Sequence, residues 1–545
     1  MNRRTLFLTT IAIACASLLT LRGQQLPLKP KLVLVLSIDQ MRFDYLTRFA
    51  RLYKGGIRTL AERGAVFSHA SYRHAAAETG PGHSVLLTGR HPSHSGIVAN
   101  EWWDPFLKKA INVVEDPIQL PVGGEGRGAS PVNALSFTVG DALKLRDPLS
   151  RTVGVSLKDR SAILMAGRRA DAAYWYETAG GNFITSTYYM SHALPWLVKW
   201  NSQHLADQYA GKTWTRLLAD EAVYEKYAGA DAIEGEWDRK DIRFPHAIRG
   251  KPPEVQYYDD FRRTPFADEV TLSAALEAMK AHQLGQDDHT DIFAVGFSAT
   301  DVIGHTYGPD SQEAMDQLLR LDRVLEKLFK EVDDGVGLKN TLVVLSADHG
   351  SLPLVENLQR AGIDARRASP KVLENAVRQA FAQRFPGVNG LIAYFATDIY
   401  LDLEVIARHK LDRTAVEKTA IGALMSTGLV EKVYTHSDLM SVADSADPYL
   451  TLFKNAFFQP RSPHLNVLVK KYVYLNSQPG GTGHGTAHEY DRHIPIVFMG
   501  EGIKPGTYET ACGPEDIAPT IAHLLGLPYP REYDSRLLTE MIAAR

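Results

Sequence analysis

Cysteine is nearly absent from the sequence. The 545 residues include two cysteines, and one of them, Cys15, lies in an apolar N-terminal stretch of the kind found in export signals. Once that stretch is removed, Cys512 is the only thiol left, so the mature chain cannot form an internal disulfide. We therefore expect packing and bound metal ions to stabilise the mature protein in an oxidising compartment.

An excess of basic residues is also absent. Lys and Arg total 60 against 63 Asp and Glu, which gives a formal net charge of −3. Proteins that bind nucleic acid usually carry clustered basic surface, so this charge balance argues against a nucleic-acid partner. The composition, 45% hydrophobic and 23% charged, is that of a globular protein, and the length predicts one large domain with insertions.

The N-terminus has the outline of a secretory signal peptide, which we predict at residues 1–24. A basic start precedes an apolar stretch at about residues 6–21, and small or polar residues follow it. That stretch is at the short end for a membrane span, so we expect a periplasmic or secreted protein with no stable span after cleavage. An uncleaved anchor, a twin-arginine signal and a lipid anchor at Cys15 stay open.

Three aspartates follow predicted strands. Apolar, β-branched runs predict parallel strands buried on both faces at residues 31–38, 291–297 and 341–346. The aspartates at or shortly after their ends are Asp39, Asp301 and Asp348. Ligands of open α/β sheets bind beyond the carboxyl ends of the strands. Any one of these acids alone is equally well explained as a cap of the following turn or helix.

Histidines accompany two of these aspartates and favour a metal centre. His305 lies four residues after Asp301, and His349 directly follows Asp348. Carboxylate and imidazole groups are ligands that suit Zn²⁺. A third ligand is predicted at His484, in the glycine-rich loop at residues 480–485. The following glycine lets the backbone approach a metal closely, which distinguishes His484 from the nearby His488 and His493.

The arrangement of the elements predicts the fold class. A helix at about residues 310–330 follows the second strand, and another at residues 516–526 closes the chain. Strands that alternate with such helices predict a doubly wound, mostly parallel α/β sheet flanked by helices. One catalytic domain is expected at residues 28–545. Insertions at about 170–270 and 353–478 would form a cap, and we interpret the aromatic residues of the first as packing.

Thr79 begins a segment that is suited to an anion. The sequence Gly80-Pro81-Gly82 and the apolar run after it predict a tight turn that leads into a helix. The free N–H groups and the positive dipole end of a helix N-terminus attract phosphate or sulfate. Most Thr-Gly-Pro sequences are only turns, so the prediction depends on the surrounding residues.

In order and context, these residues resemble the two-zinc core of the alkaline phosphatase superfamily over nearly the whole mature chain. The parts of the resemblance are Asp39, the Thr79 turn, Asp301 with His305, Asp348 with His349, and His484 with Gly485. Within the superfamily, Asn100 and the SLKDR sequence at residues 156–160 resemble the threonine-nucleophile bacterial alkaline phosphatases of the PafA and PhoK type.

The resemblance implies two Zn²⁺ per chain and a role for each residue. Thr79, Asp39, Asp348 and His349 would surround one zinc, and Asp301, His305 and His484 the other. Thr79 would be the nucleophile, with a phosphothreonine intermediate that water then hydrolyses. Asn100, Lys158 and Arg160 would bind the non-bridging oxygens of a small-molecule phosphate monoester. The natural alcohol and the oligomeric state stay open.

Lys158 and Arg160 bear on the substrate class. Two cations favour a monoester dianion over a diester, which carries one negative charge fewer. We predict that both residues extend the strand-like segment at residues 152–157, so that their side chains point to the same side. Without the metal ligands, the pair would be interpreted as a solvated surface pair.

Three other functions compete with the phosphatase. A phosphodiesterase or nucleotide pyrophosphatase of the same superfamily uses the same ligands, but has no use for the charge of Lys158 and Arg160. A sulfatase needs a Cys or Ser precursor in a Cys/Ser-x-Pro-x-Arg setting, which the sequence around Thr79 lacks. A non-catalytic zinc-binding module is disfavoured because Thr79 and every predicted ligand are present.

Overall fold

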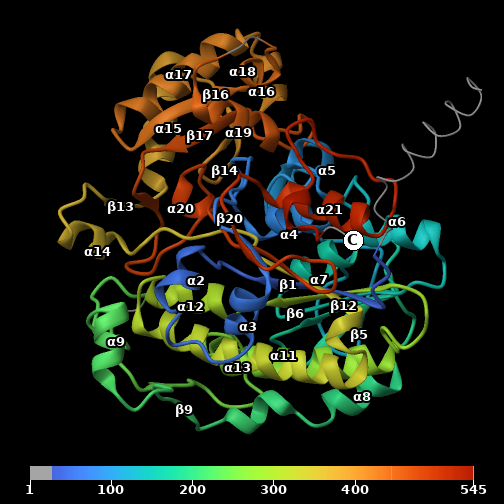
Figure 1. Cartoon of the computed structure of the whole chain (residues 1–545). Coiled ribbons are helices and arrows are strands. Elements are labelled where there is room, and N and C mark those ends of the chain that lie inside the picture. Colours follow the sequence, from blue (N-terminus) through green and yellow to red (C-terminus); the bar gives the residue numbers. More distant parts are fainter. Residues whose placement is uncertain (1–27, 238, 443–444, 544–545) are drawn as a thin grey trace, which may run out of the picture.

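The computed structural model describes residues 28–237, 239–442 and 445–543. Its centre is a ten-stranded sheet (Figure 1). In order across the sheet, the strands are β20 (Gly506–Tyr508), β2 (Ala65–Phe67), β19 (Ile496–Met499), β12 (Thr341–Ser346), β1 (Leu32–Ile38), β11 (Asp291–Phe297), β6 (Thr152–Ser156), β7 (Ala172–Tyr176), β8 (Phe183–Ser186) and β5 (Pro121–Val122).

The middle of the sheet is parallel and its edges are mixed. Strands β12, β1, β11, β6 and β7 pair in parallel with one another. Every residue of β1, β11 and β12 is buried, as the unbroken apolar runs predicted. Antiparallel pairing appears where β19 meets β12 and where β8 meets β7. The predicted α/β fold is confirmed, with a sheet that is more mixed than the sequence pattern indicated.

Two groups of helices flank the sheet (Figure 1). One group consists of α3 (Gly56–Arg63), α11 (Phe266–Ala281) and α13 (Gln312–Gly335), and the other of α4 (Thr79–Thr88), α6 (Val139–Arg146), α7 (Asp159–Ala166) and α21 (Ile517–Leu524). The predicted helices at 310–330 and 516–526 correspond to α13 and α21. Ser311 caps α13 by accepting a hydrogen bond from the Ala314 N–H.

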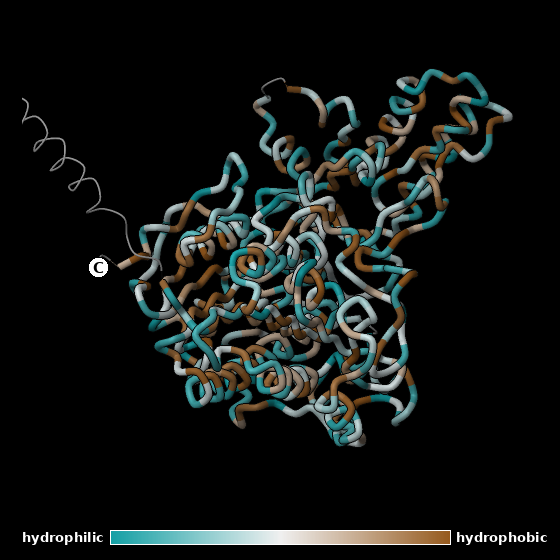
Figure 2. Tube along the Cα trace, turned by 90° about the vertical axis from the view of Figure 1, so that its right-hand side faces the viewer, coloured by the Kyte–Doolittle hydropathy of each residue, from teal (hydrophilic) through white to brown (hydrophobic). Residues whose placement is uncertain are grey.

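A second sheet has its own hydrophobic core. It is built from β14 (Ile392–Phe395), β15 (Ile399–Leu401), β17 (Leu465–Val469) and β16 (Val430–Thr435). Helices α15 (Lys371–Arg384) and α17 (Arg413–Ser426) pack against each other beside it. We call residues 371–475 the upper unit. It comes from the second predicted insertion and projects above the main body in Figures 1 and 2.

The first predicted insertion begins inside the central sheet, because β7 and β8 lie between residues 172 and 186. The segment after it, with α8 (Pro195–Asn201) and α9 (Glu221–Ala228), lies at the opposite end of the molecule from the upper unit (Figure 1). Its aromatic residues belong to the main core, where Trp214 is fully buried and donates a hydrogen bond to Asp316. The exact limits of both insertions stay predictions.

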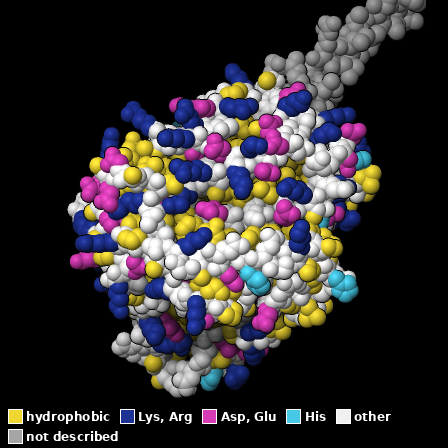
Figure 3. Space-filling model, turned by 90° about the horizontal axis from the view of Figure 1, so that it is seen from below, with side chains coloured by type: hydrophobic (Ala, Val, Ile, Leu, Met, Phe, Trp, Pro, Cys, Tyr) yellow, Lys and Arg dark blue, Asp and Glu magenta, His cyan; other side chains and the backbone are white. Residues whose placement is uncertain are grey.

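The surface and the N-terminus add two observations. The predicted signal peptide lies outside the described residues, and no helix within the described ranges is both long and apolar enough to cross a bilayer. On the face shown in Figure 3, acidic and basic side chains are interspersed. The absence of a nucleic-acid partner stays a prediction.

Candidate active site

The three predicted aspartates meet because β1 lies between β11 and β12. All three strands run parallel, and Ser37 near the end of β1 is in register with Gly296 and Ser346. Asp39, Asp301 and Asp348 are almost fully buried, with exposed fractions of 0%, 3% and 0%. The sequence pattern therefore correctly indicated one edge of the sheet as the place where acidic side chains collect.

Asp301 is held by a helix rather than by the strand end itself. It lies in the first turn of α12 (Ala299–Tyr307), directly after β11. Four residues are about one helical turn, so His305 lies on the same face of α12. Its Nε2 is 3.2 Å from Asp301 Oδ1. The DVIGH spacing thus presents a carboxylate and an imidazole to the same space.

Gln40 connects two of the aspartates and was missed in the sequence. Its backbone N–H donates to Asp348 Oδ1 at 3.0 Å, and its side-chain amide donates to Asp301 Oδ1 at 2.8 Å. Its φ of 63° lies in the left-handed region, where residues other than glycine are uncommon. Such strain is often found at functional sites. Its position directly after Asp39 was the available signal.

The three predicted histidine ligands have their ring nitrogens fixed by backbone carbonyls. Nδ1 of His305 donates to Thr482 O at 2.7 Å, Nδ1 of His349 to Gly350 O at 2.9 Å and Nδ1 of His484 to Ala77 O at 2.8 Å. A carbonyl oxygen can only accept, so Nδ1 carries the proton in each bond. In the neutral form of each ring, Nε2 then carries the lone pair that a metal ion would accept, the arrangement found in metal-binding histidines.

The donor atoms form two overlapping groups. Ligand atoms of Asp39, Asp348 and His349 lie within 4.8 Å of one another, and so do those of Asp301, His349 and His484. His305 adjoins the second group through Asp301. The rings of His349 and His484 stack with centroids 3.5 Å apart. The imidazole of His349 therefore belongs to both groups of donor atoms, whereas the resemblance assigned it to one metal.

These residues fit bound cations. Asp39 Oδ1 and His349 Nε2 are buried without a hydrogen-bond partner, and Asp39 Oδ2 lies beside the Lys158 ammonium group. Buried polar atoms left in this way cost free energy unless a partner or a metal satisfies them. Burial and the neighbouring Asp348 carboxylate raise the pKa of Asp39 well above its usual range. A divalent cation would offset this crowding of negative charge.

Thr79 is the first residue of α4 and is 1% exposed. The start of this helix comes very close to the end of β12. A Cβ atom on Gly82 would lie 2.1 Å from the backbone oxygen of Asp348, so only glycine fits there. The predicted helix start is confirmed, and its glycine lets the first turn of α4 approach the backbone of Asp348.

Arg160 and Lys158 contact this cluster from the start of α7. Arg160 Nη2 donates to Thr79 Oγ1 at 3.3 Å. Lys158 Nζ lies 2.7 Å from Asp39 Oδ2 and 2.5 Å from Asp301 Oδ2, between the two groups of acids. Although burial alone would lower it, these carboxylates raise the pKa of Lys158.

The predicted extended conformation of this segment is wrong. Strand β6 ends at Ser156, Lys158 is the N-cap residue of α7, and Arg160 lies in the first turn of that helix. The apolar run from Ala162 to Ala166 is buried, and it packs as a helix directly after the strand. The two cations approach the site because they begin a helix, and not because their side chains alternate along a strand.

Asn100 and Glu78 support the turn before α4. Asn100 Oδ1 accepts a hydrogen bond from Gly80 N–H at 2.7 Å. Glu78 Oε2 accepts from Asn100 N–H at 2.8 Å. These two hydrogen bonds fix the Asn100 side chain next to the first turn of α4. Glu78 was not predicted from the sequence, and its place directly before Thr79 was the only signal.

His83 is a further residue that was not predicted. It is fully buried one helical turn after Thr79. Its Nδ1 is 2.9 Å from Thr79 O and 3.2 Å from Asp348 Oδ2, and its Nε2 is 3.0 Å from Ser37 Oγ. His83 therefore connects the helix of the predicted nucleophile with a predicted metal ligand.

Comparisons with known proteins agree with this geometry. The profile of the family described as type I phosphodiesterase / nucleotide pyrophosphatase matches residues 33–491. Alkaline phosphatase PafA of Elizabethkingia meningoseptica is 33% identical over 524 residues, 94% of this chain and 95% of the relative. Alkaline phosphatase PhoV of Synechococcus elongatus is 34% identical over 526 residues, which are 94% of this chain and 93% of the relative. The crystal structure of wild-type PafA superposes with a TM-score of 0.88 at 33% identity, over 95% of this chain and 100% of that chain.

Proposed function

Because the chain belongs to the type I phosphodiesterase / nucleotide pyrophosphatase family of the alkaline phosphatase superfamily and is a phosphatase, we propose that it is an alkaline phosphatase that hydrolyses phosphate monoesters. The proposed reaction depends on zinc and passes through a phosphothreonine intermediate. We further propose that it is exported through its N-terminal signal. The main support for this reaction is the position of Thr79. It lies at a helix N-terminus, and its hydroxyl oxygen accepts a hydrogen bond from Arg160.

Two zinc ions would fit the donor atoms described above. Thr79, Asp39, Asp348 and His349 would hold one, and Asp301, His305 and His484 the other. When bound, the metals would lower the pKa of the threonine hydroxyl and of water and stabilise charge on the attacking and leaving oxygens. Asp39 Oδ1 and His349 Nε2, both buried without a hydrogen-bond partner, support this assignment.

The remaining steps belong to the chain itself. Thr79 Oγ attacks phosphorus in line with the departing alcohol, and the P–O bond to the alcohol breaks as the bond to Thr79 forms. Water then attacks the phosphothreonine and releases inorganic phosphate. The side-chain amide of Asn100 and the guanidinium of Arg160, together with the positive dipole end of α4, would hold the non-bridging oxygens.

The charge around Thr79 favours monoesters. Each close contact between a cation and an extra phosphate charge contributes up to about 4 kcal/mol at an effective dielectric constant of 20. Arg160 already reaches Thr79. Lys158 pairs with Asp39 and Asp301, and metal ions bound by these acids would free its ammonium group for substrate.

The test compares one monoester with one diester. Purified protein is analysed for bound metal, and kcat/KM is measured with p-nitrophenyl phosphate and bis-p-nitrophenyl phosphate at alkaline pH. We expect about two zinc ions per chain and a monoester preference of several orders of magnitude. A preference for the diester would identify the protein as a phosphodiesterase of the same family and contradict the proposal.

A further inference from the structure

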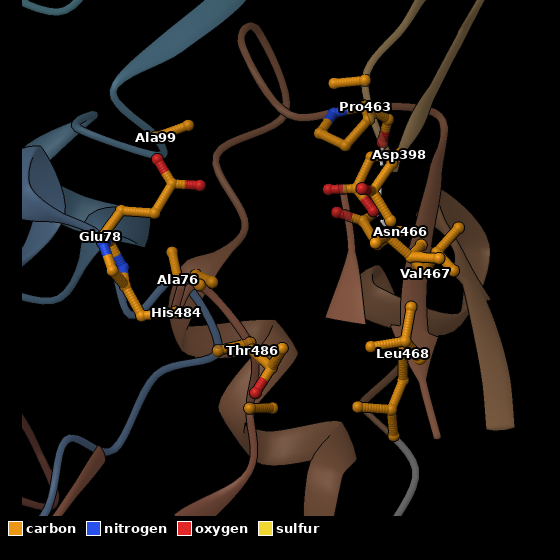
Figure 4. A pocket seen from close by; sticks show the side chains of 18 of the residues that line it. Ala76, Glu78, Ala99, Asp398, Pro463, Asn466, Val467, Leu468, His484 and Thr486 are labelled. Carbon is orange, nitrogen blue, oxygen red and sulfur yellow. Dashed lines mark hydrogen bonds between the residues drawn. The ribbon is translucent and has the colours of Figure 1, made fainter. Parts of the chain in front are cut away.

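A cavity of about 270 Å³ lies beside the candidate active site, where the upper unit meets the main body. Glu78, which precedes Thr79, and His484 lie on one side of it. Asp398 and Asn466 of the upper unit lie across the open space (Figure 4). A phosphoryl group held at Thr79 would therefore have its alcohol portion within reach of this cavity.

The wall of the cavity is mostly apolar. Ala76 and Ala99 contribute from the main body, and Phe453, Val467 and Leu468 from the upper unit. Such a surface excludes water from the carbon skeleton of a bound alcohol and favours its burial. Space and an apolar lining alone do not select between alcohols of similar size.

Among the described residues that line the cavity, every Asp, Glu, Lys or Arg side chain is an acid. Four carboxyl groups line it, those of Glu78, Glu101, Asp398 and Asp491, and no Lys or Arg does within the described residues. Apart from the metal ion that His484 would help to hold, the charged neighbours of a bound alcohol in this cavity are therefore acids. An anion that entered would lose its hydration and gain no Lys or Arg partner, which is costly.

Asp398 is the acid best placed to recognise the far end of an alcohol. Its Oδ1 accepts a hydrogen bond from the Val467 N–H at 2.6 Å, which holds the carboxyl group in place and leaves Oδ2 available to the cavity. Glu78 is fixed similarly, because its Oε2 accepts a hydrogen bond from the Asn100 N–H, which leaves Oε1 available to the cavity. The two acids thus present acceptors from opposite walls.

We propose that this cavity is the alcohol subsite, and that it selects phosphate monoesters whose alcohol joins an apolar body to an ammonium group and rejects alcohols that carry a second anion. This inference rests on the proposed phosphatase function and adds the class of substrate. Asp398 would favour the ammonium group by accepting its hydrogen bond. A second acidic group on the substrate would be disfavoured, because no described lining residue is a Lys or Arg that could pair with it.

Two aryl phosphates of matched size test this selection. Tyramine phosphate carries an ammonium at the end of a two-carbon chain, and the phosphate of 3-(4-hydroxyphenyl)propionate carries a carboxylate there. Both leave as para-alkyl phenolates, so their intrinsic reactivity is closely matched. At pH 8 we expect kcat/KM of the wild type to be at least about tenfold higher for tyramine phosphate, the ratio that corresponds to about 1.4 kcal/mol, mainly through KM.

The variant Asp398→Asn keeps the size of the side chain and its acceptor for the Val467 N–H. We expect it to reduce the ratio between the two substrates to within about threefold of unity, a difference of less than about 1 kcal/mol. Glu404→Gln removes a charge from the exposed surface of the same unit, where Glu404 pairs with Lys108, and serves as the matched control. It should keep the wild-type ratio.

The outcomes separate the two claims. If the wild type hydrolyses neither aryl phosphate nor p-nitrophenyl phosphate, the proposed function fails and this inference fails with it. If the wild type hydrolyses both aryl phosphates equally well, the phosphatase function stands and the subsite is wrong. The subsite is also wrong if Asp398→Asn, folded by circular dichroism, keeps the full wild-type ratio.

Discussion

The two sheets of this protein carry different kinds of side chain at the active site. The middle strands of the central sheet are buried along their whole length and deliver acids and histidines that fit metal ions. The second sheet is smaller, and two of its strands, β14 and β16, are exposed in part. It delivers apolar side chains and one carboxyl group, on Asp398, to the cavity. Under the two proposals above, the central sheet would supply the chemistry and the upper unit the selection between substrates.

The largest effect is expected from a metal ligand of the central sheet. In Asp348→Ala, one predicted metal loses a charged ligand, so bound zinc should fall to about one ion per chain and kcat/KM for p-nitrophenyl phosphate by roughly a thousandfold or more. Metal analysis and steady-state kinetics measure both. Asp398→Asn in the upper unit should keep its full metal content, and equal metal loss in both variants would remove the distinction between the two sheets.

The next effect concerns the cations at the start of α7. Removing Lys158 and Arg160 together should lower kcat/KM for p-nitrophenyl phosphate about a hundredfold more than for bis-p-nitrophenyl phosphate, because the monoester carries the extra charge that they stabilise. Equal losses on the two substrates would mean that these residues support only the fold. Replacing the exposed pair Arg366 and Lys371 in the same way is the control.

A smaller effect is expected from a residue that contacts a ligand rather than the metal. His83→Ala removes the imidazole that lies 3.2 Å from Asp348 Oδ2. Loss of such a partner weakens metal affinity by about 10-fold to 100-fold, which a zinc titration against a chelator measures. His488→Ala deletes a buried histidine that bonds to Val469 O and should not change zinc affinity.

The smallest effect concerns the upper unit and pH. Burial raises the pKa of Asp398 to about 7, above its unfolded value. The stability that this group contributes is therefore complete below about pH 4 and is lost as pH rises through 7. Because Asp398 is partly exposed, we expect a contribution of roughly 1 kcal/mol. Urea unfolding at pH 5 and pH 8 should show a smaller decline for Asp398→Asn than for the wild type, and identical declines would contradict the assigned pKa.

The sequence predicted those parts of the molecule that depend on local pattern. The unbroken apolar runs of β1, β11 and β12 indicated parallel strands, and the glycines after Thr79 indicated the start of a helix. Pairing direction is not visible in such runs, so the antiparallel position of β19 could not be predicted. The start of α7 was misjudged because a charged Lys-x-Arg segment fits a strand end and a first helical turn equally well.

Long-range contacts account for what was missed. Gln40 and His83 owe their roles to Asp348, which lies far from both in the chain. The cavity combines segments near residues 78, 398 and 484, which no periodicity relates to one another. Polar residues directly beside predicted ligands, such as Gln40 and Glu78, are the best signal that a sequence offers for such supporting roles.

The central claim, that Thr79 carries the phosphoryl group, is tested most directly by trapping it. The wild type is mixed with a phosphate monoester, quenched in acid within milliseconds and digested, and the peptides are analysed by mass spectrometry. We predict phosphate on Thr79 in the wild type, and in Thr79→Ala no phosphopeptide and a loss of phosphate release with folded protein. Phosphate on another residue, or near wild-type turnover by Thr79→Ala, would contradict the account.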